Sequence, residues 1–304
     1  MCTLVIGAGQ VGPHVALQLA RRGESVRVGT RSGSGPEHPL VERVRLDATD
    51  PADLDRAFAD VDVVHLCLHA SAYRPDVWER ELYPLEAGVL AAAARHGVHV
   101  VYVVYPESVY AFDTSGVLGD DLRIAPRSAM GRIRAELLAR RAASPARTTS
   151  VVASDFYGPG ASMAHGGDRM REPAAEGRTV RPLGRVDLPH AWTYLPDLAS
   201  AMIAATELPA APDRVVLAPV VHATQRELAT AYAVAAGHTS ARVRPVPAWV
   251  LKALAPVSAD MRAMAAMSYL FTEPLLVDEQ TSVERLGIAA TPLEAAVGAS
   301  VAVP

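Results

Sequence analysis

A chain of 304 residues with a net charge of −4 is long enough for a large domain with a smaller lobe, and it carries no basic excess that would favour a nucleic-acid partner. No apolar run is long enough to span a membrane, so we expect no membrane partner. The two cysteines, Cys2 and Cys67, exclude a disulfide framework and a cysteine zinc site, and we expect no metal.

Short β-branched runs alternate with segments of helical period over the first 155 or so residues. The first run, "TLVI", follows no basic and apolar leader, so we expect a cytoplasmic protein. Asp50 before Pro51 is typical of a helix start. The alternation predicts an α/β fold with a doubly wound parallel sheet of the Rossmann type. The predicted strands are residues 3–6, 25–28, 41–46, 61–68, 98–104 and 149–153, and the predicted helices are 13–22, 51–59, 85–95 and 127–141.

The pattern changes after this region. Residues 156–189 are rich in Gly, Pro and Arg without a clear period, which predicts a loop region. Residues 190–222 return to strand, helix and strand, with Asp197 as the expected N-cap, and residues 223–304 have a mostly helical pattern. We predict a cofactor-binding Rossmann domain from 1–155 and 190–222, and a smaller, mostly helical substrate lobe and lid from 156–189 and 223–304.

A glycine motif joins the first strand to the first helix. "GAGQVG" places Gly7, Gly9 and Gly12 in the G-x-G-x-x-G spacing of dinucleotide-binding loops. The first glycine permits the tight turn, the second lets the backbone approach a pyrophosphate, and the third allows close packing of helix on strand. We expect Gln10 and Val11 between them to contact the cofactor too, because the helix N-terminus offers free N–H groups to phosphates.

The end of the second predicted strand indicates which dinucleotide binds. NAD enzymes usually place an acidic residue there for the ribose 2′-hydroxyl, whereas this chain has Thr30, Arg31 and Ser32. Arginine suits a 2′-phosphate through charge-assisted hydrogen bonds, and hydroxyls add donors. The residues therefore favour NADPH/NADP, with a solvated loop arginine as the alternative.

Several motifs together resemble the extended and atypical short-chain dehydrogenase/reductases, a family that includes nucleotide-sugar epimerases. They are "VIGAGQVG", "LDATDP", "VVHLCLHA", "VVYVVYPESVYAF", "SDFYGPGA" and "HAWTYLPDLASAMIAA", and they cover nearly the whole chain. The resemblance implies that Asp47 and Ala48 contact the adenine, Leu68 and His69 lie near the nicotinamide ribose, and Phe156, Tyr157 and Gly158 lie near the nicotinamide.

The catalytic Ser-Tyr-Lys pattern of that family is broken in three places. The serine aligns with Pro106, the tyrosine with Met130 and the lysine with Arg134. Methionine cannot donate a proton. Lys252 is the single lysine of the chain, so no shifted Y-x-x-x-K exists elsewhere. The resemblance implies that Arg134 can still reach the nicotinamide ribose. A positioned general acid contributes about 10²–10⁴ in rate, so the missing tyrosine has to be replaced.

Three interpretations follow. The first is an NADPH-dependent ketoreductase that acts on an aromatic ketone whose neighbouring phenol assists protonation, similar to angucyclinone ketoreductases that lack the triad. The bias toward Ala, Arg, Gly and Pro indicates a GC-rich genome, which favours a polycyclic aromatic polyketide as the substrate. In the second, a side chain replaces the acid, with Tyr105, Ser108 and His69 as the main candidates and Tyr110 and Tyr157 behind them. The third is a non-catalytic NADP(H)-binding sensor.

The loop over residues 161–180 combines glycines with methionines, which suits a lid over a flat substrate as well as an ordinary surface loop. An NADP-dependent epimerase or isomerase also remains open. We expect a monomer or a homodimer.

Overall fold

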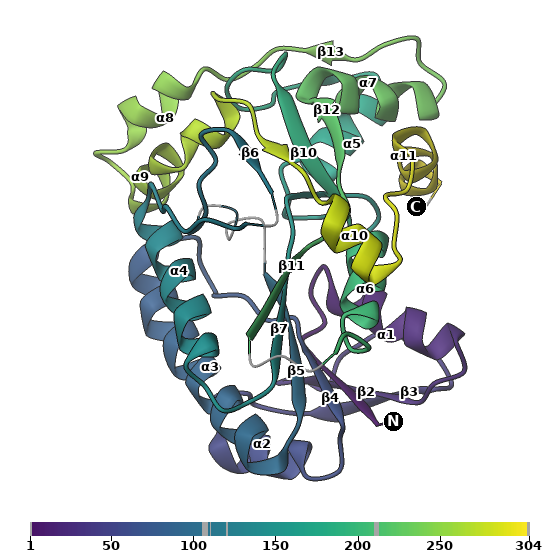
Figure 1. The fold of residues 1–304 in the computed structure, drawn as a ribbon. Helices are drawn as coiled ribbons and strands as arrows, with labels where there is room; N and C mark the ends of the chain where they lie inside the picture. The colour runs from purple at the N-terminus through teal and green to yellow at the C-terminus, as the bar shows by residue number, and fades with distance from the viewer. Residues whose placement is uncertain (1, 105–108, 110, 120, 210–212, 303–304) are drawn as a thin grey trace.

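The computed structural model describes residues 2–104, 109, 111–119, 121–209 and 213–302. Its centre is a seven-stranded sheet with the order β11-β7-β5-β4-β1-β2-β3, in which all neighbouring strands are parallel (Figure 1). This arrangement confirms the predicted doubly wound α/β fold. The strands are β1 (Thr3–Ile6), β2 (Val26–Thr30), β3 (Val41–Arg45), β4 (Val63–Leu66), β5 (His99–Val104), β7 (Thr148–Val152) and β11 (Asp213–Leu217).

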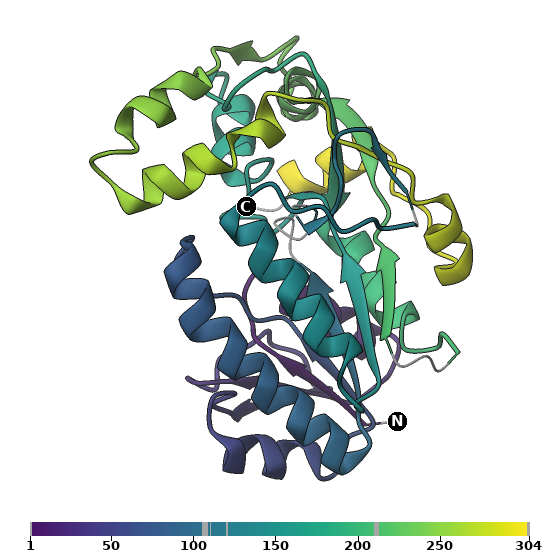
Figure 2. The same ribbon diagram turned by 60° about the vertical axis from the view of Figure 1, so that its left-hand side comes forward.

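Helices cover both faces of this sheet, as Figure 2 shows from the side. One face carries α2 (Pro51–Phe58), α3 (Pro75–His96) and α4 (Ala129–Ala142), which pack side by side. The other carries α1 (Gly12–Arg21) against α6 (Leu195–Ala204). Each layer encloses its own apolar core, because the sheet is apolar on both faces. The crossover helices thus bring the carboxyl ends of the strands to one edge, where ligands of such sheets bind.

A second lobe lies above that edge (Figure 1). It is built on a three-stranded sheet of β8 (Asp155–Tyr157), β10 (Pro189–Tyr194) and β12 (Val221–Thr224), with α5 (Asp168–Ala175), α7 (Gln225–Ala235) and α11 (Leu293–Val301) packed together beside it. The remaining elements are β6 (Val117–Leu118), β9 (Thr179–Val180), β13 (Arg242–Val243), β14 (Leu276–Val277), α8 (Ala248–Leu254), α9 (Ala259–Ala266), a 3-10 turn (Ser268–Phe271) and α10 (Gln280–Leu286).

Two local expectations differ from the structure. The helix predicted over 85–95 begins ten residues earlier, at Pro75. Proline suits the first turn because its ring fixes a helical φ, and the N–H that it lacks would have no partner within the helix there. The region 156–189, predicted to be a loop, contains β8, α5 and β9. Helix α5 carries Pro173 and begins after Gly167, so its sequence hides the helical period.

Asp197 is not the N-cap of its helix. Helix α6 begins at Leu195, with Pro196 in its first turn, and Asp197 lies inside the first turn. Its carboxylate instead accepts hydrogen bonds from the backbone N–H (2.6 Å) and the hydroxyl (2.7 Å) of Thr291. The carboxylate therefore ties the C-terminal segment to the helix. Asp50, in contrast, is the N-cap of α2 as predicted and accepts from the N–H of Ala52 at 2.9 Å.

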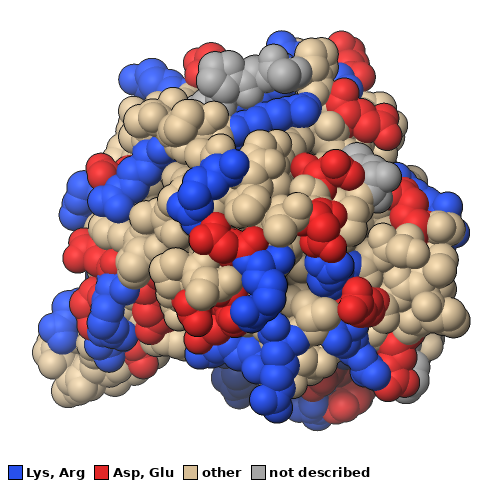
Figure 3. All heavy atoms as spheres, turned by 90° about the horizontal axis from the view of Figure 1, so that it is seen from below, with Lys and Arg blue, Asp and Glu red and all other residues tan. Residues whose placement is uncertain are grey.

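The surface alternates in charge. Figure 3 shows Lys and Arg groups interspersed with Asp and Glu groups over the face seen from below. Exposed ion pairs such as Arg95–Asp55 (2.6 Å) and Arg226–Asp187 (2.6 Å) belong to the same pattern of solvated charges. Among the residues that the structure describes, no helix is both long enough and apolar enough to cross a membrane.

Two buried histidines make stability depend on pH. Burial lowers the pKa of His65 on β4 to about 3, and that of His99 on β5 to about 4, from an ordinary 6.5. The unfolded chain therefore takes up protons below about pH 6.5 that the folded protein does not bind. We expect the free energy of unfolding to be undiminished above that pH, and to fall by about 1.4 kcal/mol per pH unit for each histidine between pH 6.5 and about 4.

Urea unfolding between pH 7 and pH 5 measures this slope. The variant His65→Leu should lose the contribution of one histidine to this slope. A His65→Leu protein with the natural slope would contradict the assignment.

Candidate active site

The glycine loop has the geometry of a dinucleotide cradle. Gly7 has a φ of +104°, and a Cβ there would lie 2.6 Å from the carbonyl oxygen of Cys67. A Cβ on Gly12 would lie 1.9 Å from the carbonyl oxygen of Gly7, so the first turn of α1 packs directly on the loop. A Cβ on Gly9 would meet no atom within 4 Å. The middle glycine thus faces open space beside a helix N-terminus, where a pyrophosphate fits.

The predicted adenine end comprises the turns after β2 and β3. The Asp47 carboxylate accepts the N–H (2.9 Å) and the hydroxyl (2.7 Å) of Thr49, and these bonds, with the charge of Arg31, lower its pKa. The hydroxyls of Thr30 and Ser32 both donate to Ser34, to its carbonyl oxygen at 2.9 Å and its hydroxyl at 2.8 Å. Arg31 is exposed. Ala48, the other predicted adenine contact, is buried beside this turn.

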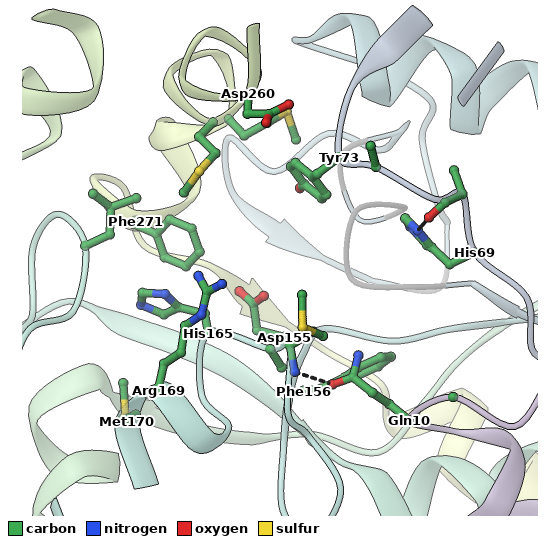
Figure 4. A pocket seen from close by; sticks show the side chains of 18 of the residues that line it. Gln10, His69, Tyr73, Asp155, Phe156, His165, Arg169, Met170, Asp260 and Phe271 are labelled. Atoms are coloured by element: carbon green, nitrogen blue, oxygen red, sulfur yellow. Dashed lines mark hydrogen bonds between the residues drawn. The ribbon is translucent and has the colours of Figure 1, made fainter. Parts of the chain in front are cut away.

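One cavity of about 810 Å³ extends from the glycine loop into the second lobe. Six predicted cofactor residues line it, namely Gly7, Gly9, Gln10, Leu68, His69 and Phe156. The second lobe contributes an apolar wall that includes Met163, Met170, Met264, Met267 and Phe271. Figure 4 shows Gln10 and His69 on one side of this space and Phe271 and Met170 on the other. The cofactor loop and the lobe therefore share one chamber.

His69 and Tyr157 differ in their access to that chamber. His69 lines the cavity, its Nδ1 lies 3.1 Å from the carbonyl oxygen of Ala70, and its ring meets the edge of Trp78 at 5.1 Å. Tyr157 is completely buried, with its ring 5.3 Å from that of Tyr194, and burial raises its pKa. Tyr157 is therefore a poor proton donor. Tyr105, Pro106, Ser108 and Tyr110 lie outside the described residues.

The cavity also holds polar groups that sequence reasoning missed. Asp155 lines it and accepts a hydrogen bond from Nε2 of His190 at 2.6 Å, and His165 lines it with its Nε2 2.6 Å from Oε1 of Gln225. The partners are 35 and 60 residues apart in sequence. The signal available was Asp155 itself, a carboxylate in the "SDFYGPGA" motif that follows the last predicted strand.

A family model, the NAD dependent epimerase/dehydratase family, matches residues 3–218. The chain belongs to this family. A nicotinamide cofactor accordingly suits the glycine cradle. No curated protein matches the chain.

Solved structures show the shared fold at low identity. The UDP-glucose 4-epimerase of Thermotoga maritima is 17% identical, with a TM-score of 0.74 over 99% of this chain and 97% of that one. The UDP-glucose 4-epimerase of Thermus thermophilus, in complex with NAD, is 18% identical, with a TM-score of 0.75 over 99% and 98%. A double mutant of the dTDP-glucose 4,6-dehydratase DesIV from Streptomyces venezuelae is 18% identical, with a TM-score of 0.76 over 99% and 96%.

Met130 and Arg134, which we predicted to align with the family's tyrosine and lysine, face the protein interior. Helix α4 begins at the N-cap Ser128, whose hydroxyl accepts the N–H of Gly131 at 3.0 Å. Met130 is 1% exposed within the core between sheet and helices. Arg134 is 4% exposed, and its guanidinium lies 4.4 Å from the ring centre of Trp78. Neither residue is part of the cavity wall as far as the structure describes it. The predicted contact between Arg134 and the nicotinamide ribose stays a prediction.

Proposed function

We propose that this protein is an NADPH-dependent ketoreductase that reduces a ketone of a polycyclic aromatic compound of the angucyclinone type. The observation that carries the proposal is the single cavity that joins the glycine loop to a wall of methionines and Phe271. Methionine side chains are polarizable and adapt to flat rings, and a volume of about 810 Å³ lies in the range of sites for drug-sized ligands. A nicotinamide held at the glycine loop would supply the hydride, and the cavity wall would position the ketone beside it.

Protonation is the step for which the chain lacks the family's residue. Met130 has no proton to donate, and Tyr157 is buried with a raised pKa. A phenol next to the ketone has an ordinary pKa near 10, like the missing tyrosine, and can hydrogen-bond the developing oxyanion. Orientation alone can contribute about 7–11 kcal/mol, so a positioned, self-assisted substrate suffices. Tyr105, Ser108 and His69 stay the side-chain alternatives.

Sugar-nucleotide epimerisation is the second candidate function. It is favoured by Arg169 and Arg181, two arginines in the cavity wall that can pair with a diphosphate, and by the epimerases among the similar folds. It is disfavoured by the missing tyrosine and lysine.

The deciding experiment follows NADPH consumption and product mass with 1-hydroxyanthraquinone, whose phenol neighbours a ketone, and with 1-methoxyanthraquinone. UDP-glucose with NAD tests the epimerase. Turnover of the hydroxy compound at least 100-fold above the methoxy compound supports the reductase that takes its acid from the substrate. NADPH binding without turnover of either compound favours a sensor. Loss of reduction, with NADPH still bound, in Tyr105→Phe, Ser108→Ala or His69→Asn would show that the side chain supplies the acid.

The preference for NADPH depends on Arg31 in this proposal. We expect Arg31→Ala to raise the Kd of NADPH roughly 10- to 100-fold, the equivalent of a charge-assisted hydrogen bond of about 1.5–3 kcal/mol, and to leave the Kd of NADH unchanged. Fluorescence titration of both dinucleotides measures this. The control Arg43→Ala, at an exposed arginine paired with Glu37 (3.3 Å), should change neither affinity. Equal weakening of both cofactors by Arg31→Ala would contradict the 2′-phosphate contact.

A further inference from the structure

The side-chain amide of Gln225 fixes the tautomer of His165. Gln225 is 2% exposed at the start of α7, and its Nε2 donates to two backbone carbonyl oxygens, those of Leu183 (2.9 Å) and Arg185 (3.2 Å). Both amide hydrogens are thereby used, so Oε1 is the acceptor for the Nε2–H of His165 at 2.6 Å. A neutral imidazole that donates from Nε2 carries its lone pair on Nδ1.

The surroundings of His165 hold the ring in place and keep it neutral. Its centre lies 4.3 Å from that of Phe271, and the ring lies nearly parallel to Trp192 at 6.4 Å. Burial is the main cause that lowers the pKa of His165, although the nearby Asp155 carboxylate acts in the opposite direction. At neutral pH the ring on the cavity wall therefore offers a hydrogen-bond acceptor.

A second acceptor lies beside it. Asp155 uses Oδ2 for the Nε2–H of His190, which is 3% exposed and packs 4.6 Å from Trp192. Because Asp155 lines the cavity, its other carboxylate oxygen, Oδ1, is the one left for a ligand. Figure 4 shows the His165 ring on the side of the cavity away from Gln10 of the glycine loop, with the Asp155 carboxylate between the two. The two side chains together form what we call the acceptor pair.

We propose that the acceptor pair, Nδ1 of His165 and Oδ1 of Asp155, is a specificity subsite that binds a hydroxyl group of the substrate. The inference rests on the proposed function and narrows its substrate class to hydroxylated polycyclic aromatics. A hydroxyl donates to either acceptor. An ether oxygen is only an acceptor, so it leaves both acceptors of the pair without a donor. A site built to bond a hydroxyl discriminates strongly against analogues that lack it.

The test measures binding rather than turnover, in the protein saturated with NADP⁺, so that no reduction occurs. The probes are 2-hydroxyanthraquinone and 2-methoxyanthraquinone, which differ in whether the substituent at position 2 can donate a hydrogen bond. We expect the hydroxy compound to bind about 10- to 100-fold more tightly. In His165→Phe this ratio should fall below about 3, and in His165→Asn, which retains an acceptor, it should largely persist. The exposed-site control His96→Asn should behave as the natural protein.

Asp155→Asn tests the second acceptor. The amide oxygen can still accept from His190, and this places the NH₂ donor toward the cavity. The preference for the hydroxy compound should then shrink at least 5-fold, because the NH₂ group can donate to a hydroxyl oxygen and to an ether oxygen alike. Thermal unfolding of each variant shows that the change is not a loss of fold.

The outcomes separate this inference from the proposed function. A hydroxyl preference that depends on His165, without NADPH-dependent reduction of any ketone, supports the subsite and contradicts the reductase. Reduction of both anthraquinones with equal affinities supports the reductase and overturns the subsite. Equal binding, or no binding of either probe to the natural protein, overturns the subsite as well.

Discussion

Gly9→Ala is expected to weaken nicotinamide dinucleotide binding roughly 10- to 100-fold without changing the thermal unfolding midpoint. The added Cβ would meet no protein atom within 4 Å, so the folded chain has room for it. The same methyl group occupies the space through which the backbone approaches the pyrophosphate, and the loss of one charge-assisted hydrogen bond there costs about 1.5–3 kcal/mol.

Gly12→Ala should mainly lower the stability of the fold, whereas Gly9→Ala mainly weakens cofactor binding. Its Cβ would lie 1.9 Å from the carbonyl oxygen of Gly7, a backbone atom that cannot turn away. Helix α1 must then move off the loop, at a cost of about 3 kcal/mol in the free energy of unfolding. Calorimetry and cofactor titration on both variants measure the contrast, with Gly298→Ala, whose Cβ also meets nothing within 4 Å, as the control for helix propensity. A Gly9→Ala protein with natural affinity would show that the dinucleotide binds elsewhere.

Arg141→Met should destabilise the protein by about 3–5 kcal/mol, although Arg141 is remote from the cavity. Arg141 is 2% exposed and forms two hydrogen bonds to the buried Glu86, from Nε at 2.8 Å and from Nη2 at 2.5 Å. Its guanidinium also lies over the ring of Tyr102 at 3.8 Å. This pair joins α3 to α4 across their buried faces, and removing one charge leaves the other without its counter-charge in the interior.

The double variant Glu86→Leu/Arg141→Met provides the internal test, because it removes both charges together. It should recover most of the lost stability, since apolar side chains of similar volume often replace a buried ion pair at little cost. The neighbouring Arg140→Met is the matched control: Arg140 is exposed, forms an i,i+4 pair with Glu136 (3.0 Å), and should cost less than about 0.5 kcal/mol. Urea unfolding of the natural protein, Glu86→Leu, Arg141→Met and the double variant gives the coupling energy, and Arg140→Met is measured beside them. Additive effects in the double variant would contradict a buried ion pair.

Met130 and Arg134, which the resemblance aligns with the family's tyrosine and lysine, both serve packing. Met130 belongs to the apolar core, and Arg134 stacks on the buried Trp78, so both positions of α4 are used for packing in the described structure. A tyrosine at 130 would place its hydroxyl where methionine now meets apolar neighbours. Introducing the family's tyrosine alone would therefore bury a polar group in the core without completing the Ser-Tyr-Lys pattern.

The alternation of β-branched runs with helical periods, read along the chain, was enough to predict the doubly wound sheet, since each crossover helix needs an apolar stripe and each buried strand an apolar run. The Gly7, Gly9 and Gly12 spacing likewise predicted the cradle, because its geometry depends on neighbours within one turn. Helix α5 escaped prediction because Pro173 and the surrounding polar residues obscure its period.

The polar groups of the cavity were decided by tertiary structure alone. His165 meets Gln225 over a separation of 60 residues and Asp155 meets His190 over 35, and outside the cavity Asp197 bonds Thr291 over 94. Such pairs form only after the second lobe has folded over the sheet edge, and no local pattern of charge or hydropathy encodes which distant donor reaches which acceptor. The sequence by itself determined the framework and the cofactor loop, whose interactions are local. The packing of the lobe decided which side chains face the substrate, because long-range contacts depend on the complete fold.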